Sequence, residues 1–441
     1  MTKCFLSMLM LLPVSGWAQD KDTQQPPTQF TADINMMTRG EIRNGGMSAN
    51  PDNTSPEDKS AFVLNRERLI FGFQRDMLEA KTSIQHVGTW GHEGAASVNV
   101  YEAWAKMRTQ NGMFAQIGRL ALRYDDERII GSDDWVMASM THDALRLGYE
   151  GNGHKVHTIL AYNQNMRALS EPGSFYANGS RPYKTMHTVW YHYDIPQAPL
   201  GVSLLFMNIG MQAGEEGGIG DNEAKTEWQL VYGGYLKYAP SNWQIEASYY
   251  RQAGHDEYKA KLDAWMATAK VEWKPADNWS LEAGYDYLSG DDYVAVVNKG
   301  GLGMPRHEVN KGFNPVYGSH HKFYGAMDFF YLSTYVNGFT PGLQNAYVGG
   351  TIKPLRNLSL GAAYHYLATG TKLAELDKTL GHEIEINASY RVTKDVNLAA
   401  GYSYMTGTET MERLKRASGD GSLRWGWLSL IISPRLFSAK W

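Results

Sequence analysis

The sequence predicts an all-β protein, a transmembrane antiparallel up-and-down β-barrel of 18 strands with short periplasmic turns and long extracellular loops. Three observations predict this fold class. Apolar and polar residues alternate with period two over segments of about 9–14 residues, the length of tilted membrane strands. The connections between these segments alternate between short and long, and the N-terminus carries an export signal.

The N-terminal segment 1–18 is a predicted secretory signal peptide. Lys3 precedes a short apolar run, and small residues precede the expected cleavage site after Ala18. Cys4, the only cysteine, is removed with this segment, so the mature chain has no cysteine left for a disulfide. Residues 19–29 are expected to be a periplasmic lead-in.

The composition of the remaining chain, with the barrel expected over 30–437, supports one membrane domain. Aromatic residues make up 12% of the sequence, yet the mean hydropathy is −0.43. Strands that face lipid on one side and water on the other produce this combination. A net charge of −4 gives no indication of a nucleic-acid partner.

The alternation is clear in segment 227–238. Its apolar face carries Trp228, Leu230 and Tyr232, while Glu227 and Gln229 lie on the other face. The alternative is a soluble, secreted β-sandwich. Sandwich strands also alternate, but strands of soluble domains average about 5–6 residues, so the longer segments favour a membrane barrel.

The connections determine the strand number. Eight short polar turns are predicted at 75–76, 109–112, 151–153, 196–199, 240–242, 275–278, 354–357 and 393–395. Nine longer polar loops are predicted at about 45–60, 91–97, 125–141, 167–183, 212–224, 252–263, 290–342, 369–380 and 408–421. Seventeen connections join eighteen strands, with both chain ends in the periplasm.

Segment 321–330 tests this count, because it resembles a further strand. A strand there would place the turn at 354–357, and every later turn, on the wrong side of the membrane. We therefore interpret 290–342 as one long extracellular loop. This interpretation leaves open whether part of the loop folds into the lumen.

The predicted inward faces of the first strands are basic. If apolar faces meet lipid, the pore-lining residues are expected to be Arg66, Arg68, Lys106, Arg108, Arg119, Arg123 and Arg146. Such a wall favours anionic solutes. The alternative is that the basic residues pair with Glu79, Glu102 and Glu150 and merely keep the lumen hydrated.

Two stretches, 118–135 and 286–292, are rich in carboxylates. Together with 320–328, they give the expected loop or constriction residues Asp125, Asp126, Arg128, Asp134, Asp291, Asp292, His321, Lys322 and Asp328. We expect no cofactor and no metal site. The spacing is not that of an EF-hand, although clustered oxygen ligands leave a structural Ca²⁺ open. The simpler interpretation is that carboxylates and Arg128 hold the loops against the barrel wall.

Four motifs carry a resemblance to a known family. They are GRLALRYDDERIIGSDDW at 118–135, DYLSGDD at 286–292, NPVYGSHHKFYGAMDFF at 314–330 and GHEIEI at 381–386. Their order resembles the alginate export family of outer-membrane proteins, in the version common in Bacteroidota, and the resemblance extends over about 30–437.

This resemblance implies a monomeric, porin-like 18-stranded barrel with an Arg-rich lumen, which in the best-known members passes the anionic polysaccharide alginate. It implies pore or constriction roles for Arg119, Arg123, Asp125, Arg128, Asp134, Lys322 and Asp328.

The function predicted from these features is a channel in the bacterial outer membrane. We expect passive diffusion of polar, anionic solutes, such as acidic oligo- or polysaccharides, and no enzymatic activity. The alternatives are a barrel enzyme and a surface-binding or adhesin protein with a plugged bore. Ser319, His320 and His321 supply residue types for the enzyme, but no nucleophile motif frames them.

Overall fold

The computed structural model describes residues 27–44, 59–163, 183–212, 226–256, 259–291, 309–330, 340–373, 376–415 and 422–441. The predicted signal peptide, the part of the predicted lead-in before residue 27 and several loops lie outside these described residues. So does Asp292, one of the expected loop residues.

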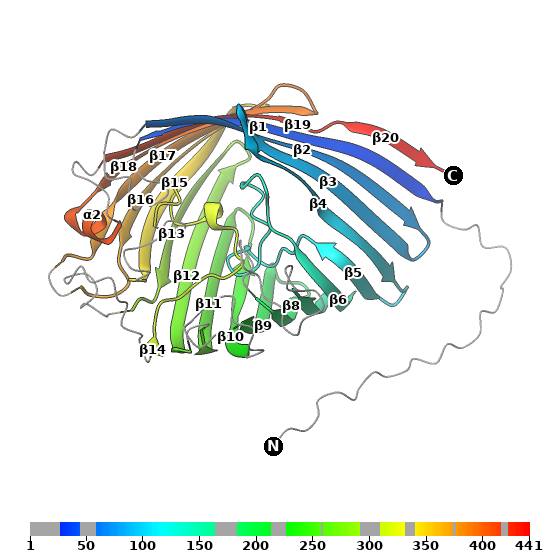
Figure 1. The fold of residues 1–441 in the computed structure, drawn as a ribbon, viewed down its shortest axis with the longest axis horizontal. Helices are drawn as coiled ribbons and strands as arrows, with labels where there is room; N and C mark the ends of the chain where they lie inside the picture. Colours follow the sequence, from blue (N-terminus) through cyan, green and yellow to red (C-terminus); the bar gives the residue numbers. More distant parts are fainter. Residues whose placement is uncertain are drawn as a thin grey trace, which may run out of the picture.

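Eighteen long strands form the wall of a closed antiparallel barrel (Figure 1). They are β1 (Gln29–Asn44), β2 (Lys59–Arg75), β3 (Leu78–Thr89), β4 (His92–Arg108), β5 (Met113–Leu120), β6 (His142–Gly151), β7 (His154–Tyr162), β8 (Thr185–Asp194), β9 (Leu200–Gln212), β10 (Thr226–Tyr238), β11 (Trp243–His255), β12 (Lys261–Ala276), β13 (Trp279–Leu288), β15 (Leu343–Leu355), β16 (Leu358–Ala368), β17 (Thr379–Arg391), β18 (Val396–Gly407) and β19 (Ser422–Ile432). The predicted strand number is therefore confirmed.

The barrel closes between its first and last strands. β1 pairs with β2 along its whole length and with β19 on its other edge, where Met36 lies opposite Ile432. β20 (Arg435–Lys440) follows β19 and pairs with the N-terminal part of β1. Closure leaves no open sheet edge between first and last strand, which is the condition for a β-sheet to span a membrane.

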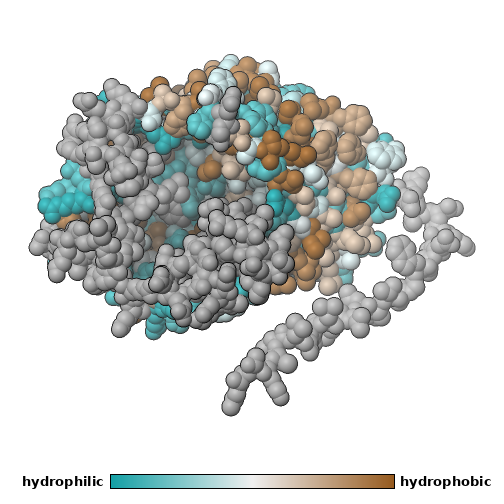
Figure 2. All heavy atoms as spheres, in the orientation of Figure 1, coloured by the Kyte–Doolittle hydropathy of each residue, from teal (hydrophilic) through white to brown (hydrophobic). Residues whose placement is uncertain are grey.

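The outer face carries the apolar half of each strand. In β17, Ile384 and Ile386 are exposed on the outer face, whereas Glu383, the residue before Ile384, is buried inside the barrel. Figure 2 shows brown, apolar residues gathered over the strands on one side of the molecule. Of the helices in the described parts of the chain, none has the length and apolar character needed to span a membrane.

Short turns join the strands at one end of the barrel, at all eight predicted places. Four of them contain a non-glycine residue with positive φ: Asp76, Asn152, Gln197 and Ser241. The turns at Asp76 and Asn152 have two residues, and two-residue hairpins favour such left-handed conformations because they match the twist of the paired strands. Polar residues with short side chains at three of these places are therefore part of the turn geometry.

Two predicted loops are wrong in extent. Residues 92–97 belong to β4, which turns back tightly from β3, with Thr89 opposite His92. β11 and β12 similarly extend over most of 252–263, leaving only residues 256–260 between them. Both stretches are polar at strand ends, and strand ends that rise above the apolar band lose the apolar half of the alternation.

As predicted, the segment 321–330 is part of a loop and not a strand of the barrel wall. A short 3-10 helix (His320–Lys322) overlaps its start, and the segment lies in the connection 289–342, here called L7. L7 also contains the two-residue strand β14 (Val309–Asn310), which pairs in parallel with β12. A helix that the sequence did not predict, α2 (Glu409–Lys415), lies between β18 and β19.

Candidate functional site

The connection between β5 and β6, residues 121–141 and here called L3, lies inside the ring of strands. At one point Asp125 accepts hydrogen bonds from Trp190 on β8, at 3.1 Å, and from Ser203 on β9, at 2.5 Å. At another point Asp134 accepts from Arg68 on β2, at 2.8 Å. L3 thus bridges wall strands that are six positions apart in the barrel.

L7 also lies in the bore and is fixed to the opposite part of the wall. The backbone N–H of Met327 donates to Glu383 on β17, at 2.9 Å. Gln252 on β11 donates to the carbonyl of Asn314, at 2.6 Å. The cyan L3 and the yellow part of L7 are both visible within the ring of strands (Figure 1).

The two loops are joined to each other. Ser319 of L7 donates to Glu127 of L3 and accepts from the backbone N–H of Asp133, each at 2.9 Å. Lys322 forms an ion pair with Glu127 at 2.5 Å. Ile130 and Tyr317 form a parallel backbone bridge. L3 and L7 therefore constrict the bore as one packed unit.

Arg128 is at the centre of this unit. Its guanidinium binds Asp126 at 2.9 Å and Asp286 of β13 at 2.8 Å, and it lies 3.9 Å from the ring centre of Phe323. The side chain is buried. Arg128 thus holds the loops to the wall, which was the simpler of the two sequence interpretations.

An aromatic cluster fixes L3 near the barrel closure. Trp135 stacks on His321 of L7, with ring centres 3.9 Å apart, and its other neighbours are Trp425 and Trp427 of β19. Arg39 of β1 lies 3.9 Å from the centre of the Trp135 ring. His321 also forms an ion pair with Asp328 at 2.8 Å.

Arg66 and Arg68 face the bore, as predicted, but L3 covers them. Only 1% and 6% of their surfaces are exposed. Asp134 binds both guanidinium groups, at 3.1 and 2.8 Å, and Ser139 accepts a further hydrogen bond from Arg68 at 2.7 Å. Burial alone raises the pKa of Asp134, but the two arginines outweigh it, and the net effect is a lowered pKa. These two arginines therefore anchor L3.

A second basic cluster remains accessible closer to the short turns. Lys106, Arg108 and Arg146 surround the ring of Phe114, at 4.7, 5.3 and 5.5 Å from its centre. Arg108 pairs with Glu150 at 2.8 Å. Within the described residues, neither Lys106 nor Arg146 has a carboxylate within 4.0 Å, and the same holds for exposed Arg123 of L3. Three cations of the predicted wall are thus not neutralised by direct pairing.

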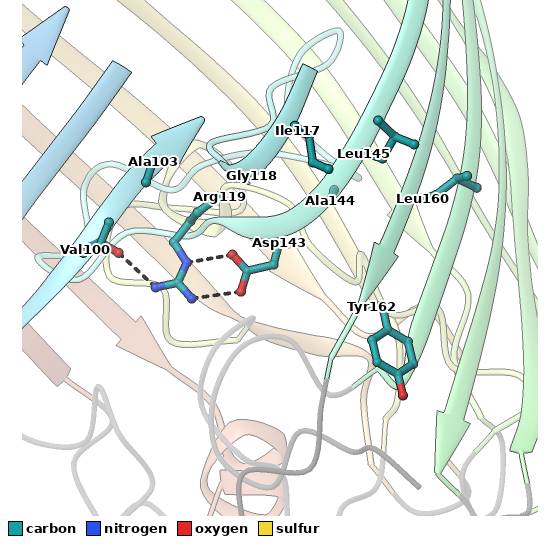
Figure 3. Close-up of a pocket in the computed structure, with 10 residues that line it drawn as sticks. All are labelled: Val100, Ala103, Ile117, Gly118, Arg119, Asp143, Ala144, Leu145, Leu160 and Tyr162. Carbon is teal, nitrogen blue, oxygen red and sulfur yellow. Dashed lines mark hydrogen bonds and ion pairs between the residues drawn. The ribbon is translucent and has the colours of Figure 1, made fainter. Parts of the chain in front are cut away.

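Arg119 is a correction to the predicted pore lining. In β5, Phe114, Gln116 and Leu120 are buried inside, whereas Arg119 shares the outer face with Ile117. Its guanidinium binds Asp143 on β6 through two contacts of 2.8 Å (Figure 3). Leu120 shares the inner face with Phe114 and Gln116, and its apolar side chain packs into the core that L3 forms in the bore.

The acidic loop residues are engaged within the protein. Burial, reinforced by nearby Asp328, raises the pKa of Asp133 to about 6. Burial also raises the pKa values of Asp125 and Asp126, against their hydrogen-bond donors. Asp291 is buried, with its backbone N–H bound to the carbonyl of Thr340. Among the described residues, no three carboxylate, His or Cys side chains are grouped as metal ligands.

Several important residues were not predicted from the sequence. Glu383 lies in the GHEIEI motif, but nothing in that motif indicated that it accepts backbone N–H groups of L7. Arg39 and Glu41 of β1 pair at 2.9 Å inside the barrel. Their alternation with outward residues places them in the bore, and this signal was available in the sequence.

The Ser-His-His stretch lacks the geometry of a nucleophile. The hydroxyl of Ser319 donates to Glu127, and its other bond is to the backbone of Asp133. Burial lowers the pKa of His320 to about 3, so this imidazole is neutral at ordinary pH. Ser319 and His321 instead pack L7 against L3, through Asp133 and Trp135 respectively.

Comparisons with known proteins agree with this architecture. The model of the alginate export family matches residues 75–419. A search of curated proteins finds no match. Among solved structures, OpdL of Pseudomonas aeruginosa has a TM-score of 0.62 and 12% identity, covering 92% of this chain and 99% of its own. OccK2 (OpdF) of the same organism, solved in complex with glucuronate, has a TM-score of 0.60 and 13% identity, with 92% and 98% coverage. At these identities the solved structures establish the fold alone.

Proposed function

Since this chain belongs to the alginate export family and is an outer-membrane channel for solute passage, we propose that it conducts polar, anionic solutes by passive diffusion. Acidic oligo- or polysaccharides are the solute class that we favour. We further propose that the channel acts as a monomer, since one chain closes a complete barrel and a bore therefore needs no second copy. The long loops then lie outside the cell and the short turns in the periplasm.

The observation that carries the choice of anions is the accessible basic cluster on the β4–β6 wall. Lys106 and Arg146 lie around Phe114 with no described carboxylate in direct contact. Arg123 of L3 is a further exposed cation. Cations that line a narrow, water-filled passage raise the local concentration of anions. The buried pair Arg66 and Arg68 is excluded from this role, because L3 covers both.

Two cavities adjoin the constriction and supply polar surface to a passing solute. One, of about 260 Å³, lies between L7 and β16–β19 and includes Lys322, Asn387 and Trp427. The other, of about 470 Å³, includes Trp190, Lys155 and Lys237 together with carboxylates such as Asp126 and Glu246, so its lining carries both signs of charge. Hydroxyl-rich solutes exchange water for such amide, ammonium and indole groups at little net cost, which suits passage without tight binding.

Planar-bilayer recording tests this proposal. Under a KCl gradient the reversal potential of the wild-type channel is expected to show that Cl⁻ is more permeant than K⁺. The double variant Lys106→Gln/Arg146→Gln is expected to move that potential towards zero or beyond. Lys394→Gln, in an exposed turn, removes the same kind of charge outside the bore and is expected to leave it unchanged. A cation preference of the wild type contradicts the choice of anions.

A second candidate function has one observation in its favour. L3 and L7 pack an extensive apolar core inside the bore, as expected of a surface receptor with a plugged barrel. Complete absence of conductance from correctly folded protein supports the receptor and overturns the channel. The enzyme alternative has no comparable support, since Ser319 lacks a histidine partner among the described residues.

A further inference from the structure

The barrel wall changes height between β4 and β6. β4 pairs with β5 only from Ala103 to Arg108, and its residues 92–102 continue beyond that pairing with β3 as their strand neighbour. β5 ends at Leu120, where the chain turns into the bore. Figure 1 shows the long arrow of β4 beside the short arrows of β5 and β6.

Gly118 brings β5 close to β4 immediately before this departure. Its φ of 130° lies in the region that other residues rarely adopt, and a β-carbon there would overlap the carbonyl oxygen of Ala103. The close approach and the end of β5 leave a step in the outer surface. The step is therefore a consequence of L3 leaving the wall.

A cavity of about 630 Å³ occupies this step on the outer face (Figure 3). Its apolar lining includes Val100, Ile117, Leu160 and Tyr162, which are all exposed, Ile117 by 61%. These side chains belong to the outward-facing set of β4, β5 and β7. In a membrane barrel this set faces lipid, so hydrocarbon is the medium available to fill the cavity.

One ion pair lies in this otherwise apolar lining. Arg119 binds Asp143 through two contacts of 2.8 Å and also donates to the carbonyl of Val100, at 3.1 Å. The two side chains are 39% and 49% exposed. Charges that face hydrocarbon are costly, whereas Arg–phosphate contacts at the headgroup level are favourable. Tyr162, which is also exposed, is typical of that level.

We propose that this cavity is a binding site for a single phosphate-bearing lipid of the outer leaflet. Its hydrocarbon chain lies against Val100, Ile117 and Leu160. Its phosphate accepts hydrogen bonds from the guanidinium of Arg119, which shares them with Asp143. The site is outside the bore, and it does not depend on which solute the channel conducts.

Native mass spectrometry of the delipidated, full-length protein tests the proposal. The protein is titrated with diphosphorylated lipid A, with the same lipid after enzymatic removal of its phosphates, and with inorganic phosphate. One diphosphorylated lipid is expected to bind at the lowest concentrations, ahead of weaker annular lipids. The dephosphorylated lipid and inorganic phosphate are each expected to bind about tenfold more weakly or not at all, equivalent to about 1.4 kcal/mol or more.

Variants assign the site to this cavity. Arg119→Gln is expected to weaken the first binding event about tenfold. Arg251→Gln is the matched control, because Arg251 forms an outer-face ion pair with Asp263 at 2.6 Å, with 45% and 48% exposure, and does not line the cavity. Asp143→Asn breaks the ion pair but keeps the cation, so it is expected to preserve or strengthen binding.

Only protein that shows the gel mobility of a folded barrel is compared. The proposal is overturned if Arg119→Gln and Arg251→Gln bind the phosphorylated lipid equally, or if removing the phosphates has no effect. It is also overturned if Asp143→Asn weakens binding as much as Arg119→Gln, since the ion pair then acts only on the shape of the wall.

Discussion

Asp134 is the carboxylate partner of two arginines that face the bore. Arg66 and Arg68 are buried by L3, so removing their carboxylate partner leaves charge without compensation. We expect Asp134→Asn to weaken docking of L3 by about 1.5–3 kcal/mol, towards the lower value because Asp134 is half exposed and screened by solvent.

Hydrogen exchange of residues 132–140 measures this change. Faster exchange than in the wild type, together with a reversal potential shifted towards anions, is the expected outcome. Asp395→Asn, in an exposed turn, serves as the control. Unchanged exchange in Asp134→Asn contradicts the anchoring role of the arginines.

Asp133 predicts a pH dependence of the joint between L3 and L7. Its pKa is about 6 in the packed loops, because of burial and the nearby Asp328 carboxylate, against 3.8 when the loop is undocked. A raised carboxyl pKa means that the docked state holds the proton more firmly. Docking is therefore strongest at low pH and weakens as the pH rises through about 6.

Hydrogen exchange at pH 5 and pH 7.5, corrected for intrinsic rates, measures this dependence. Exchange in L3 is expected to be slower at pH 5, and Asp133→Asn is expected to remove most of the difference. His321, whose charge lowers the pKa of Asp133, limits the size of the effect. Slower exchange at pH 7.5 is the outcome that the burial of Asp133 does not allow.

At the scale of residues, the sequence predicted which side of the wall a side chain faces better than it predicted which residue that side chain contacts. Alternation correctly placed Arg66, Arg68, Lys106 and Arg108 inside. It did not predict that Asp134, 66 positions after Arg68, binds both Arg66 and Arg68. These contacts depend on where L3 folds. For Arg119 it predicted the wrong side, because the rule that apolar residues face lipid fails where the chain leaves the wall.

At the scale of elements, L7 depends on one close approach to the wall. Gly325 has a φ of 89°, and a β-carbon there would overlap the Glu383 carboxylate that holds L7. We expect Gly325→Ala to detach this part of L7 while the barrel stays closed. Larger, noisier single-channel currents are the expected sign.

Gly91→Ala is the matched control for this prediction. Gly91 also has a positive φ, of 75°, but a β-carbon there has no atom within 4 Å. The control carries the backbone cost of about 1–2 kcal/mol without the overlap. Equal currents from the two variants contradict the role of Glu383 as the anchor of L7.

Turn parity predicted the elements of the wall, including the exclusion of a strand at 321–330. The course of L3 and L7 was not predictable in the same way. These loops contain left-handed, non-glycine residues such as Asp125, Glu127 and Val316. Such conformations persist only when tertiary contacts impose them, so local sequence does not specify them.

At the scale of the whole molecule, an eighteen-stranded wall encloses more space than its own side chains fill. L3 and L7 occupy much of that space with a shared apolar core and buried ion pairs. Width is therefore set by the loops and not by strand number. The sequence established the wide barrel, whereas the contacts in the bore determine how narrow the passage is.

The central claim is that the protein is a channel whose aperture L3 restricts. Single-channel recording tests it most directly, with the wild type compared with a variant in which residues 123–139 are replaced by a short glycine linker. The account predicts that the wild type conducts and that the variant, still a folded barrel, conducts markedly more. Equal conductance of the two proteins, or none from either, contradicts it.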